Sequence, residues 1–273
     1  MKNLIITAIA IFMFFNAFGH EEWILNSKYL KSPGKVMVFK PQNYLKSKHY
    51  PLVYLLHGYS ENYTQWSKTT DLQRLANQYQ FIIVTPEGFT SYYINSHQPD
   101  GDQYEDFFFK ELLPRVHQSL SIDKQNVFIG GLSMGGYGAL RYFILNQGYF
   151  NTAASTSGAL EIDFNDLEKA SKQFWQSSRM TNDLIKVFGH PEQNDWHQYS
   201  ISNLLTRNQN FNKPFLMDCG TSDILYPASL TVKVSAEKLG IPISFISQPG
   251  NHNTEYWKKA IEYHFIYFKQ HLR

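Results

Sequence analysis

A serine between two glycines is the residue in this sequence most clearly placed to do chemistry. Gly131-Leu-Ser-Met-Gly135 matches the pattern G-x-S-x-G, after the apolar run 127–129 and before a helix-like stretch, 137–146. In this pattern a serine is held at a sharp turn between a strand and a helix, where its hydroxyl can act as a nucleophile. The flanking glycines let neighbouring backbone approach closely. The motif therefore predicts Ser133 as a nucleophile.

A serine hydroxyl at its ordinary pKa is a weak nucleophile, so this hypothesis needs a base and a group that orients the base. With this type of serine turn, an acid and then a histidine follow the serine in the chain. Asp223 comes just after the apolar run 214–220, and His252 follows the next apolar run. Asp218 is a rival acid, but it lies inside its strand run. We expect Ser133, Asp223 and His252 to meet at one edge of a sheet.

Acyl transfer also needs two N–H groups that stabilise the negative charge on the substrate oxygen. One is expected from Met134, the residue after the nucleophile. The other is expected from the turn His57-Gly58-Tyr59, and we assign it to the N–H of Tyr59. Each such donor typically lowers the barrier by roughly 3–4 kcal/mol. A plain strand-terminating turn is the alternative interpretation of His57-Gly58.

Apolar runs that fit buried strands alternate with helix-like stretches along the chain. The runs are 36–40, 51–57, 81–84, 127–129, 214–220 and 243–246. The helix-like stretches are 71–78, 104–120, 137–146 and 254–272, with Pro114 expected to kink or interrupt the second of them. Strands that are apolar on both faces and alternate with helices predict an α/β fold, with a mostly parallel central sheet flanked by helices.

The stretch between Gly158 and Lys213 breaks this alternation, because it carries several aromatic residues and no clear strand. One interpretation is an ordinary connecting helix with loops. The other is an inserted cap over the edge where open α/β sheets bind their ligands. A connection of this length is unusual in a compact fold unless it has a function. We therefore predict a short cap-like insertion at 161–212 within one domain, residues 20–273.

Four segments together resemble the esterase D family, a branch of the α/β-hydrolases. They are Leu55–Trp66, Gly131–Leu140, Gly220–Asp223, and Gly250–His252 followed by Trp257. The resemblance runs over nearly all of the chain after residue 34. It implies an α/β-hydrolase fold, a Ser133–Asp223–His252 triad, and hydrolysis of carboxylic esters through an acyl-enzyme without a metal or other cofactor. The segment 161–212 matches no single subfamily, so the resemblance leaves the natural substrate open.

Aromatic side chains are candidates to line the substrate cleft, where they could hold a feruloyl group or a sugar ring. The candidates are Trp66, Tyr92, Trp175 and Trp196. For any one of them, packing in the core or on the surface is the commoner role. We expect a secreted serine carboxylesterase for short-acyl or hydroxycinnamoyl (feruloyl or acetyl) esters, with plant polysaccharides as one source. Two alternatives stay open: an acyltransferase with the same triad, and a non-catalytic carbohydrate-binding protein on this scaffold.

The composition argues against several other classes of protein. The chain has 273 residues, is 43% hydrophobic and has a net charge of +2, which favours a packed core over disorder. Its Lys and Arg residues are spread along the chain, so no nucleic-acid partner is expected. With one cysteine, Cys219, and no HExxH or CxxC motif, the sequence predicts no metal site. The expected partner is a small-molecule or polysaccharide ester, and the sequence leaves the oligomeric state open.

The first residues have the pattern of an export signal. Lys2 precedes the run 4–15, which has one polar residue, and small residues follow at Ala17 and Gly19. A membrane-spanning helix needs about 20 apolar residues, so this run is too short to span comfortably. A basic start, a short apolar run and small residues are typical of a signal peptide. We expect residues 1–19 to be removed and the mature protein to be secreted or periplasmic, without stable membrane insertion; an uncleaved anchor is the alternative.

Overall fold

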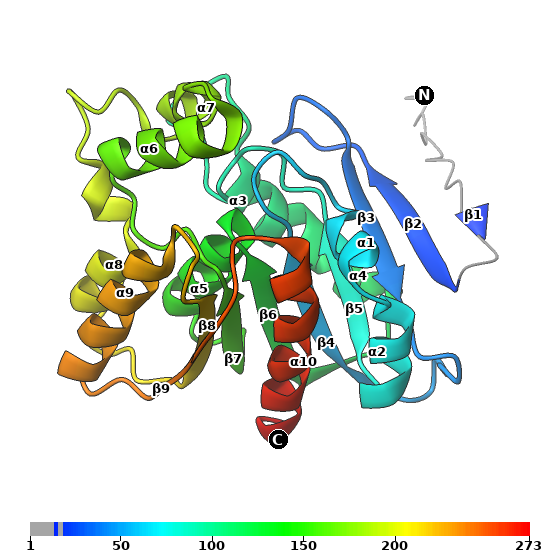
Figure 1. The fold of residues 1–273 in the computed structure, drawn as a ribbon. Helices are drawn as coiled ribbons and strands as arrows, with labels where there is room; N and C mark the ends of the chain where they lie inside the picture. The colour runs from blue at the N-terminus through cyan, green and yellow to red at the C-terminus, as the bar shows by residue number, and fades with distance from the viewer. Residues whose placement is uncertain (1–13, 16–18) are drawn as a thin grey trace, which may run out of the picture.

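The computed structural model describes residues 14–15 and 19–273, and a twisted sheet forms its centre (Figure 1). Across the sheet the strand order is β1-β2-β3-β5-β4-β6-β7-β8-β9. The strands are β1 (Phe14–Phe15), β2 (His20–Leu25), β3 (Gly34–Phe39), β4 (Tyr50–Leu56), β5 (Ile82–Pro86), β6 (Ile122–Leu132), β7 (Thr152–Thr156), β8 (Phe215–Gly220) and β9 (Ile243–Gln248). The remainder of the expected signal segment, 1–13 and 16–18, lies outside the described residues.

The sheet has an antiparallel part and a parallel part. β1, β2, β3 and β5 pair antiparallel in turn, and all pairs from β5 across to β9 are parallel. Strands β5, β7 and β8 are buried along their whole length, as expected where helices cover both faces of a parallel sheet. The predicted α/β fold with a mostly parallel sheet is therefore confirmed. Strands β1, β2 and β7 were not predicted from the sequence.

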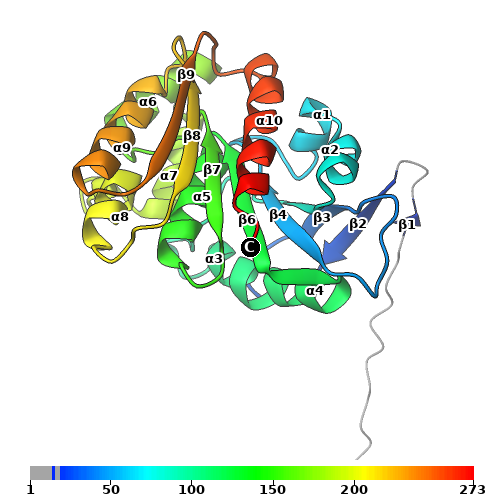
Figure 2. The ribbon, with the colours of Figure 1, turned by 90° about the horizontal axis from the view of Figure 1, so that it is seen from below.

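Two layers of helices enclose the sheet, each with its own apolar core (Figures 1 and 2). One layer consists of α1 (Gln65–Thr69), α2 (Leu72–Tyr79) and α10 (Thr254–Gln270). The other consists of α3 (Tyr104–Phe107), α4 (Leu113–Ser119), α5 (Met134–Leu145), α8 (Ile201–Arg207) and α9 (Tyr226–Lys238). This arrangement leaves the carboxyl ends of the parallel strands free to carry functional loops.

Residues 104–119 are helical throughout, but the pitch changes along the way. A π-helical turn, Phe108–Leu112, joins α3 to α4, and the N–H of Leu113 reaches back to the carbonyl of Phe108. Pro114 then lies in the first turn of α4. Proline has no N–H to donate to the preceding turn, and the change of pitch comes just before this position. The expected interruption at Pro114 is thus a change of helix type rather than a break.

The segment between β7 and β8 contains helices and no strand. It comprises α6 (Phe164–Trp175), α7 (Arg179–Phe188), the 3-10 turn η2 (Trp196–Tyr199) and α8. α6 and α7 lie beyond the sheet edge, above the ends of the central strands, whereas α8 lies beside α9 in the helical layer (Figure 1). Within the described part of the chain, no helix combines the length and apolar character needed to cross a membrane.

Candidate active site

Ser133 occupies the turn between β6 and α5 in a backbone conformation that side-chain-bearing residues rarely adopt. Its φ is 53° and its ψ is −120°, so the turn is strained. A Cβ on Gly131 would lie 2.1 Å from the carbonyl oxygen of Gly135, and one on Gly135 would lie 2.2 Å from that of Leu56. Both glycines are therefore required by close backbone contacts. The turn presents the serine hydroxyl at the sheet edge, as the motif predicts.

His252 joins Ser133 to Asp223 in a continuous hydrogen-bonded relay. The Nε2 atom of His252 lies 3.1 Å from the Ser133 Oγ. Its Nδ1 atom lies 3.1 Å from Asp223 Oδ1 and 3.0 Å from Oδ2. With the proton on Nδ1, the imidazole donates to the carboxylate and accepts from the serine hydroxyl, which is the state a general base needs. The rival acid, Asp218, pairs with His264 instead.

The environment of Asp223 keeps its carboxylate ionised although the side chain is fully buried. Burial alone raises its pKa, but the hydrogen bond and positive charge of His252 and the N–H of Leu225 outweigh burial, so the pKa lies below its ordinary value. The N–H of Leu225 lies 2.8 Å from Oδ1. A buried negative charge beside Nδ1 stabilises the imidazolium that forms when His252 takes a proton.

Two aromatic rings enclose the imidazole of His252. Phe174, from α6, lies with its ring centroid 5.2 Å from that of His252. Trp257, from α10, makes an edge contact at 5.1 Å. As a result the His252 side chain is only 12% exposed. The segment between β7 and β8 thus contacts the predicted base directly.

The N–H groups of Tyr59 and Met134 are free to bind a substrate oxygen. Neither donates a hydrogen bond to any protein acceptor among residues 14–15 and 19–273. Met134 is the first residue of α5, where the helix dipole favours negative charge. Gly58, next to Tyr59, lies beside the serine, because a Cβ on it would come 3.5 Å from the Ser133 Cβ. These positions fit the two donors predicted from the sequence.

A cavity of about 270 Å³ opens beside Ser133 and His252. Much of its lining is apolar and comes from α6, the start of α7 and neighbouring loops: Tyr92, Ala159, Leu167, Ala170, Phe174, Trp175 and Met180. Polar residues from the loop after β4, from α1 and from the start of α10 also line it: Ser60, Glu61, Gln65 and Thr254. The cavity therefore offers both an apolar surface and a polar one to an ester.

Two of the four predicted aromatic substrate contacts line this cavity, namely Tyr92 and Trp175. Trp66 does not, because it is completely buried in the core and its indole N–H donates to the carbonyl of Leu56. Trp196 does not either, because it packs in the other apolar core and its N–H donates to the carbonyl of Gly189. Their types fitted a cleft, but each indole is used for packing and for satisfying a backbone carbonyl.

Phe174 and Met180 also line the cavity, although neither was expected as a site residue from the sequence. Leu167, Ala170 and Phe174 recur three and four residues apart, so the spacing of apolar residues indicates one face of α6, and all three line the cavity. The spacing does not indicate that this face lies over the serine.

The side chain of Tyr59 connects the turn after β4 to α6 and α7. Its hydroxyl donates to Asp183 Oδ2 at 2.8 Å, and its ring meets that of Trp175 at 5.1 Å. The guanidinium of Arg179 lies over both rings, at 5.7 Å and 5.4 Å from their centroids. Burial and then Asp183 raise the pKa of Tyr59 to about 12, against the opposing effect of Arg179. At neutral pH the hydroxyl is therefore a stable donor to Asp183.

Comparison with known proteins agrees with this geometry. Residues 27–268 match the family described as "Putative esterase". The chain belongs to this family. The esterase is therefore a carboxylic ester hydrolase with an α/β-hydrolase fold, as the resemblance implied.

Similar proteins include several esterases. The acetyl esterase of Caldicellulosiruptor saccharolyticus is 26% identical over 248 residues, which cover 86% of this chain and 92% of that protein. The solved structure of the Staphylococcus aureus fluorophosphonate-binding serine hydrolase FphF superimposes with a TM-score of 0.79 at 23% identity, covering 92% of this chain and 98% of that one. A ferulic acid esterase structure gives a TM-score of 0.76 at 23% identity, with 93% and 98% covered.

Proposed function

We propose that the esterase hydrolyses carboxylic esters through an acyl-enzyme on Ser133. The observation that carries this proposal is the relay, in which His252 lies 3.1 Å from the serine hydroxyl and 3.0 Å from a buried carboxylate oxygen. Ser133 attacks the ester carbonyl carbon while His252 takes the hydroxyl proton, and the N–H groups of Tyr59 and Met134 receive the oxyanion. The C–O bond then breaks, and His252 protonates the departing alcohol.

Water completes the cycle by the same steps. His252 removes a proton from a water molecule that attacks the acyl carbon of the acyl-enzyme, and it then returns that proton to Ser133 Oγ as the acid leaves. The products are a carboxylic acid and an alcohol. No further group is needed to balance the reaction.

For the substrate, we infer an ester with a short or single-ring acyl group and a polar alcohol such as a sugar of a plant polysaccharide. The volume of about 270 Å³ lies just below the range of roughly 300–1,000 Å³ that is usual for pockets that bind drug-sized ligands. Aromatic and aliphatic residues of α6 and α7 suit an acetyl or hydroxycinnamoyl group. The similar proteins that bear the names acetyl esterase and ferulic acid esterase support the same classes.

We further propose that α6 and α7 are the functional part of a cap within 161–212. Six cavity residues come from α6, α7 and the loop before them, and one of these, Phe174, also contacts His252. The later part of the segment, with α8, packs in the helical layer.

We also propose that the esterase is exported and cleaved after Gly19. Cleavage there would leave β2, which begins at His20, intact and paired with β3 along its whole length. It would remove Phe14–Phe15, which contribute only the two-residue strand β1. The mature fold would thus keep every element that positions the site.

The replacement Ser133→Ala tests the proposed function. We expect kcat for p-nitrophenyl acetate to fall by as much as roughly a millionfold, as for other triad serines, and labelling by a fluorophosphonate to disappear. Near-normal hydrolysis by the variant would reject the assignment. A panel of acetyl, butyryl and feruloyl esters then identifies the acyl group.

Product analysis with a competing alcohol and a polysaccharide-binding assay separate the two alternative functions. An acyltransferase would give mostly the transfer product when an acceptor alcohol competes with water. A carbohydrate-binding protein would be retained on a polysaccharide column and would not be labelled by the fluorophosphonate.

A further inference from the structure

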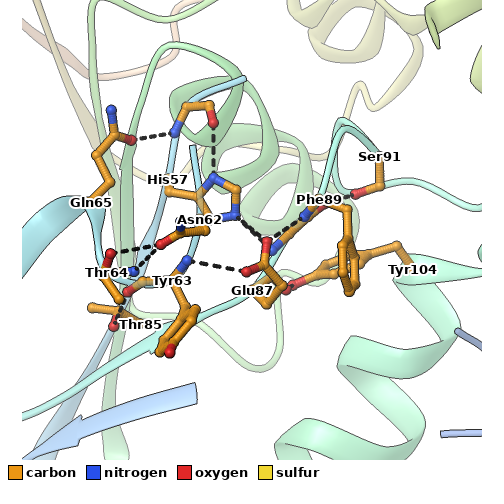
Figure 3. Close-up of polar contacts among 12 residues, drawn as sticks. His57, Asn62, Tyr63, Thr64, Gln65, Thr85, Glu87, Phe89, Ser91 and Tyr104 are labelled. Carbon is orange, nitrogen blue, oxygen red and sulfur yellow. Dashed lines mark hydrogen bonds and ion pairs between the residues drawn. The ribbon is translucent and has the colours of Figure 1, made fainter. Parts of the chain in front are cut away.

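A buried histidine that takes no part in this mechanism holds the turn after β4. His57 is 1% exposed, and its Nδ1 atom lies 2.8 Å from the carbonyl oxygen of Gly58. Its Nε2 atom lies 2.7 Å from the backbone nitrogen of Gly88 and 3.2 Å from Glu87 Oε1. Figure 3 shows the imidazole between the turn and the Glu87 carboxylate. The two ring nitrogens thus join the turn after β4 to the loop after β5.

The N–H of Gly88 points at Nε2, so Nε2 is an acceptor and the proton of the neutral imidazole is on Nδ1. An imidazolium would turn Nε2–H toward Glu87 but also against the N–H of Gly88, which is repulsive, and its Nδ1 would still carry a proton. The remaining tautomer would set the lone pair of Nδ1 against the carbonyl oxygen of Gly58, which is repulsive. The Nδ1–H group therefore donates to Gly58 in either state.

This hydrogen bond controls the direction of the N–H of Tyr59. The carbonyl of Gly58 and the N–H of Tyr59 belong to one planar trans peptide, so they point in opposite directions and rotate together. When the Gly58 carbonyl is hydrogen-bonded to His57, the N–H of Tyr59 therefore points away from the imidazole. The N–H of Glu61 also reaches this carbonyl, at the longer distance of 3.3 Å. Gln65 holds the preceding peptide, because its Oε1 accepts the N–H of Gly58 at 2.7 Å.

Glu87 in turn anchors the imidazole to the rest of the fold. Its Oε1 accepts the N–H of Phe89 at 2.9 Å, and its backbone carbonyl accepts the hydroxyl of Tyr104 at 2.6 Å. Burial raises the pKa of Glu87, but the hydrogen bond and charge of His57 and the N–H groups of Phe89 and Tyr63 lower it below its ordinary value. An ionised carboxylate thus fixes the side of the imidazole that faces away from Gly58.

We propose that His57 is a positioning residue for catalysis: by holding the carbonyl of Gly58, it aims the N–H of Tyr59 at the substrate oxyanion. This inference rests on the proposed function, in which Tyr59 supplies one of the two oxyanion donors. Since the oxyanion exists only in the transition state and the tetrahedral intermediate, a misaimed donor lowers kcat and leaves KM nearly unchanged.

Two substitutions of His57 separate positioning from general structural support. In His57→Asn the side-chain amide nitrogen is bonded to Cγ, as Nδ1 is in histidine, and it can donate to the same carbonyl. His57→Leu has a similar size and no donor. Both variants lose the contacts with Glu87 and Gly88, so both should lose stability to a similar extent. Only His57→Leu should lose the aim of the Tyr59 N–H.

Two measurements test this: kcat and KM for p-nitrophenyl acetate, and the inhibition constant of a trifluoromethyl ketone. Circular dichroism gives the folded fraction of each variant, by which its kcat is corrected. Loss of a whole oxyanion donor costs about 10²–10³-fold in kcat, so we expect a fall of roughly 10–100-fold in His57→Leu. The ketone, which forms an oxyanion adduct with the serine, should bind correspondingly more weakly. His57→Asn should retain most of kcat.

His264→Asn is the matched control, because His264 is equally buried and is also paired with a carboxylate, Asp218. It should lose stability and keep a kcat close to that of the wild type.

The proposal is overturned if His57→Leu keeps its kcat, or if His57→Asn loses as much kcat as His57→Leu. If both His57 variants fail to fold, Glu87→Ala removes the carboxylate that anchors the imidazole; it should lower kcat with KM nearly unchanged, and a wild-type kcat in that variant would overturn the proposal. Failure of the proposed function is distinct, because wild-type protein would then escape fluorophosphonate labelling.

Discussion

Two buried aspartate–histidine pairs lie close together in this esterase, and only one of them faces a serine. Asp218 is in β8 and Asp223 follows that strand, while His264 is in α10 and His252 precedes that helix. The pairing distances are similar, 2.8 Å for His264 Nε2 to Asp218 and 3.0 Å for His252 Nδ1 to Asp223. Residue type, pairing and order along the chain therefore do not distinguish the two pairs.

The difference lies in the second nitrogen of each imidazole. In His252 that nitrogen meets the Ser133 hydroxyl beside an open cavity. In His264 it is buried, with no hydrogen-bond partner among the described residues, and the side chain is completely inaccessible. A histidine can act as a base only where its free nitrogen reaches the proton to be moved. The pair at His264 serves the packing of α10 against the sheet.

Replacing each carboxylate in turn by an amide should give the largest difference in kcat between the two pairs. Asp223→Asn should lower kcat by roughly 10⁴-fold, because an amide no longer holds the tautomer that the base requires. Asp218→Asn should leave kcat of the folded protein near the wild-type value. Steady-state hydrolysis of p-nitrophenyl acetate measures both. Equal losses in the two variants would mean that the pairs are not functionally distinct.

The pair of His264 and Asp218, which should not affect kcat, should instead affect the free energy of unfolding. His264→Gln leaves the buried carboxylate of Asp218 without its histidine, and removing one partner of a buried pair typically costs about 3–5 kcal/mol in the free energy of unfolding. Thr156, which also donates to Asp218, remains, so we expect the lower end of this range. Urea denaturation measures the change. The exposed His190 provides the control His190→Gln, which should shift the unfolding free energy by less than about 0.5 kcal/mol; equal shifts would contradict the assignment.

The smallest effect concerns acid pH. The pKa of folded Asp223 is lowered, so its ionisation stabilises the fold above the ordinary pKa of about 3.9, and this contribution is lost as pH falls through the lower folded value. Relative to Asp223→Asn, the wild type should therefore gain unfolding free energy as pH rises from about 3 to 5. Urea midpoints across this range measure the gain. A difference between the two proteins that stays constant with pH would argue against the lowered pKa.

The sequence alone was sufficient for the features that depend on local pattern. The glycines around Ser133 are required by contacts within one turn, and the strand runs are apolar because both faces are covered. Ser133, Asp223 and His252 each follow a predicted strand run, now β6, β8 and β9, and this placed them at one edge, because the carboxyl ends of parallel strands meet there. These statements need only the chain direction and the period of each element.

Only the tertiary structure decided which side chains face the cavity. Trp66 and Trp175 are the same residue type, yet one packs in the core and the other lines the cavity, because each orientation depends on elements distant in sequence. The same holds for His57, whose contact with Glu87 joins two different strand ends. Burial and hydrogen-bond partners depend on how distant elements pack together, and the spacing of residues along the chain does not specify that packing.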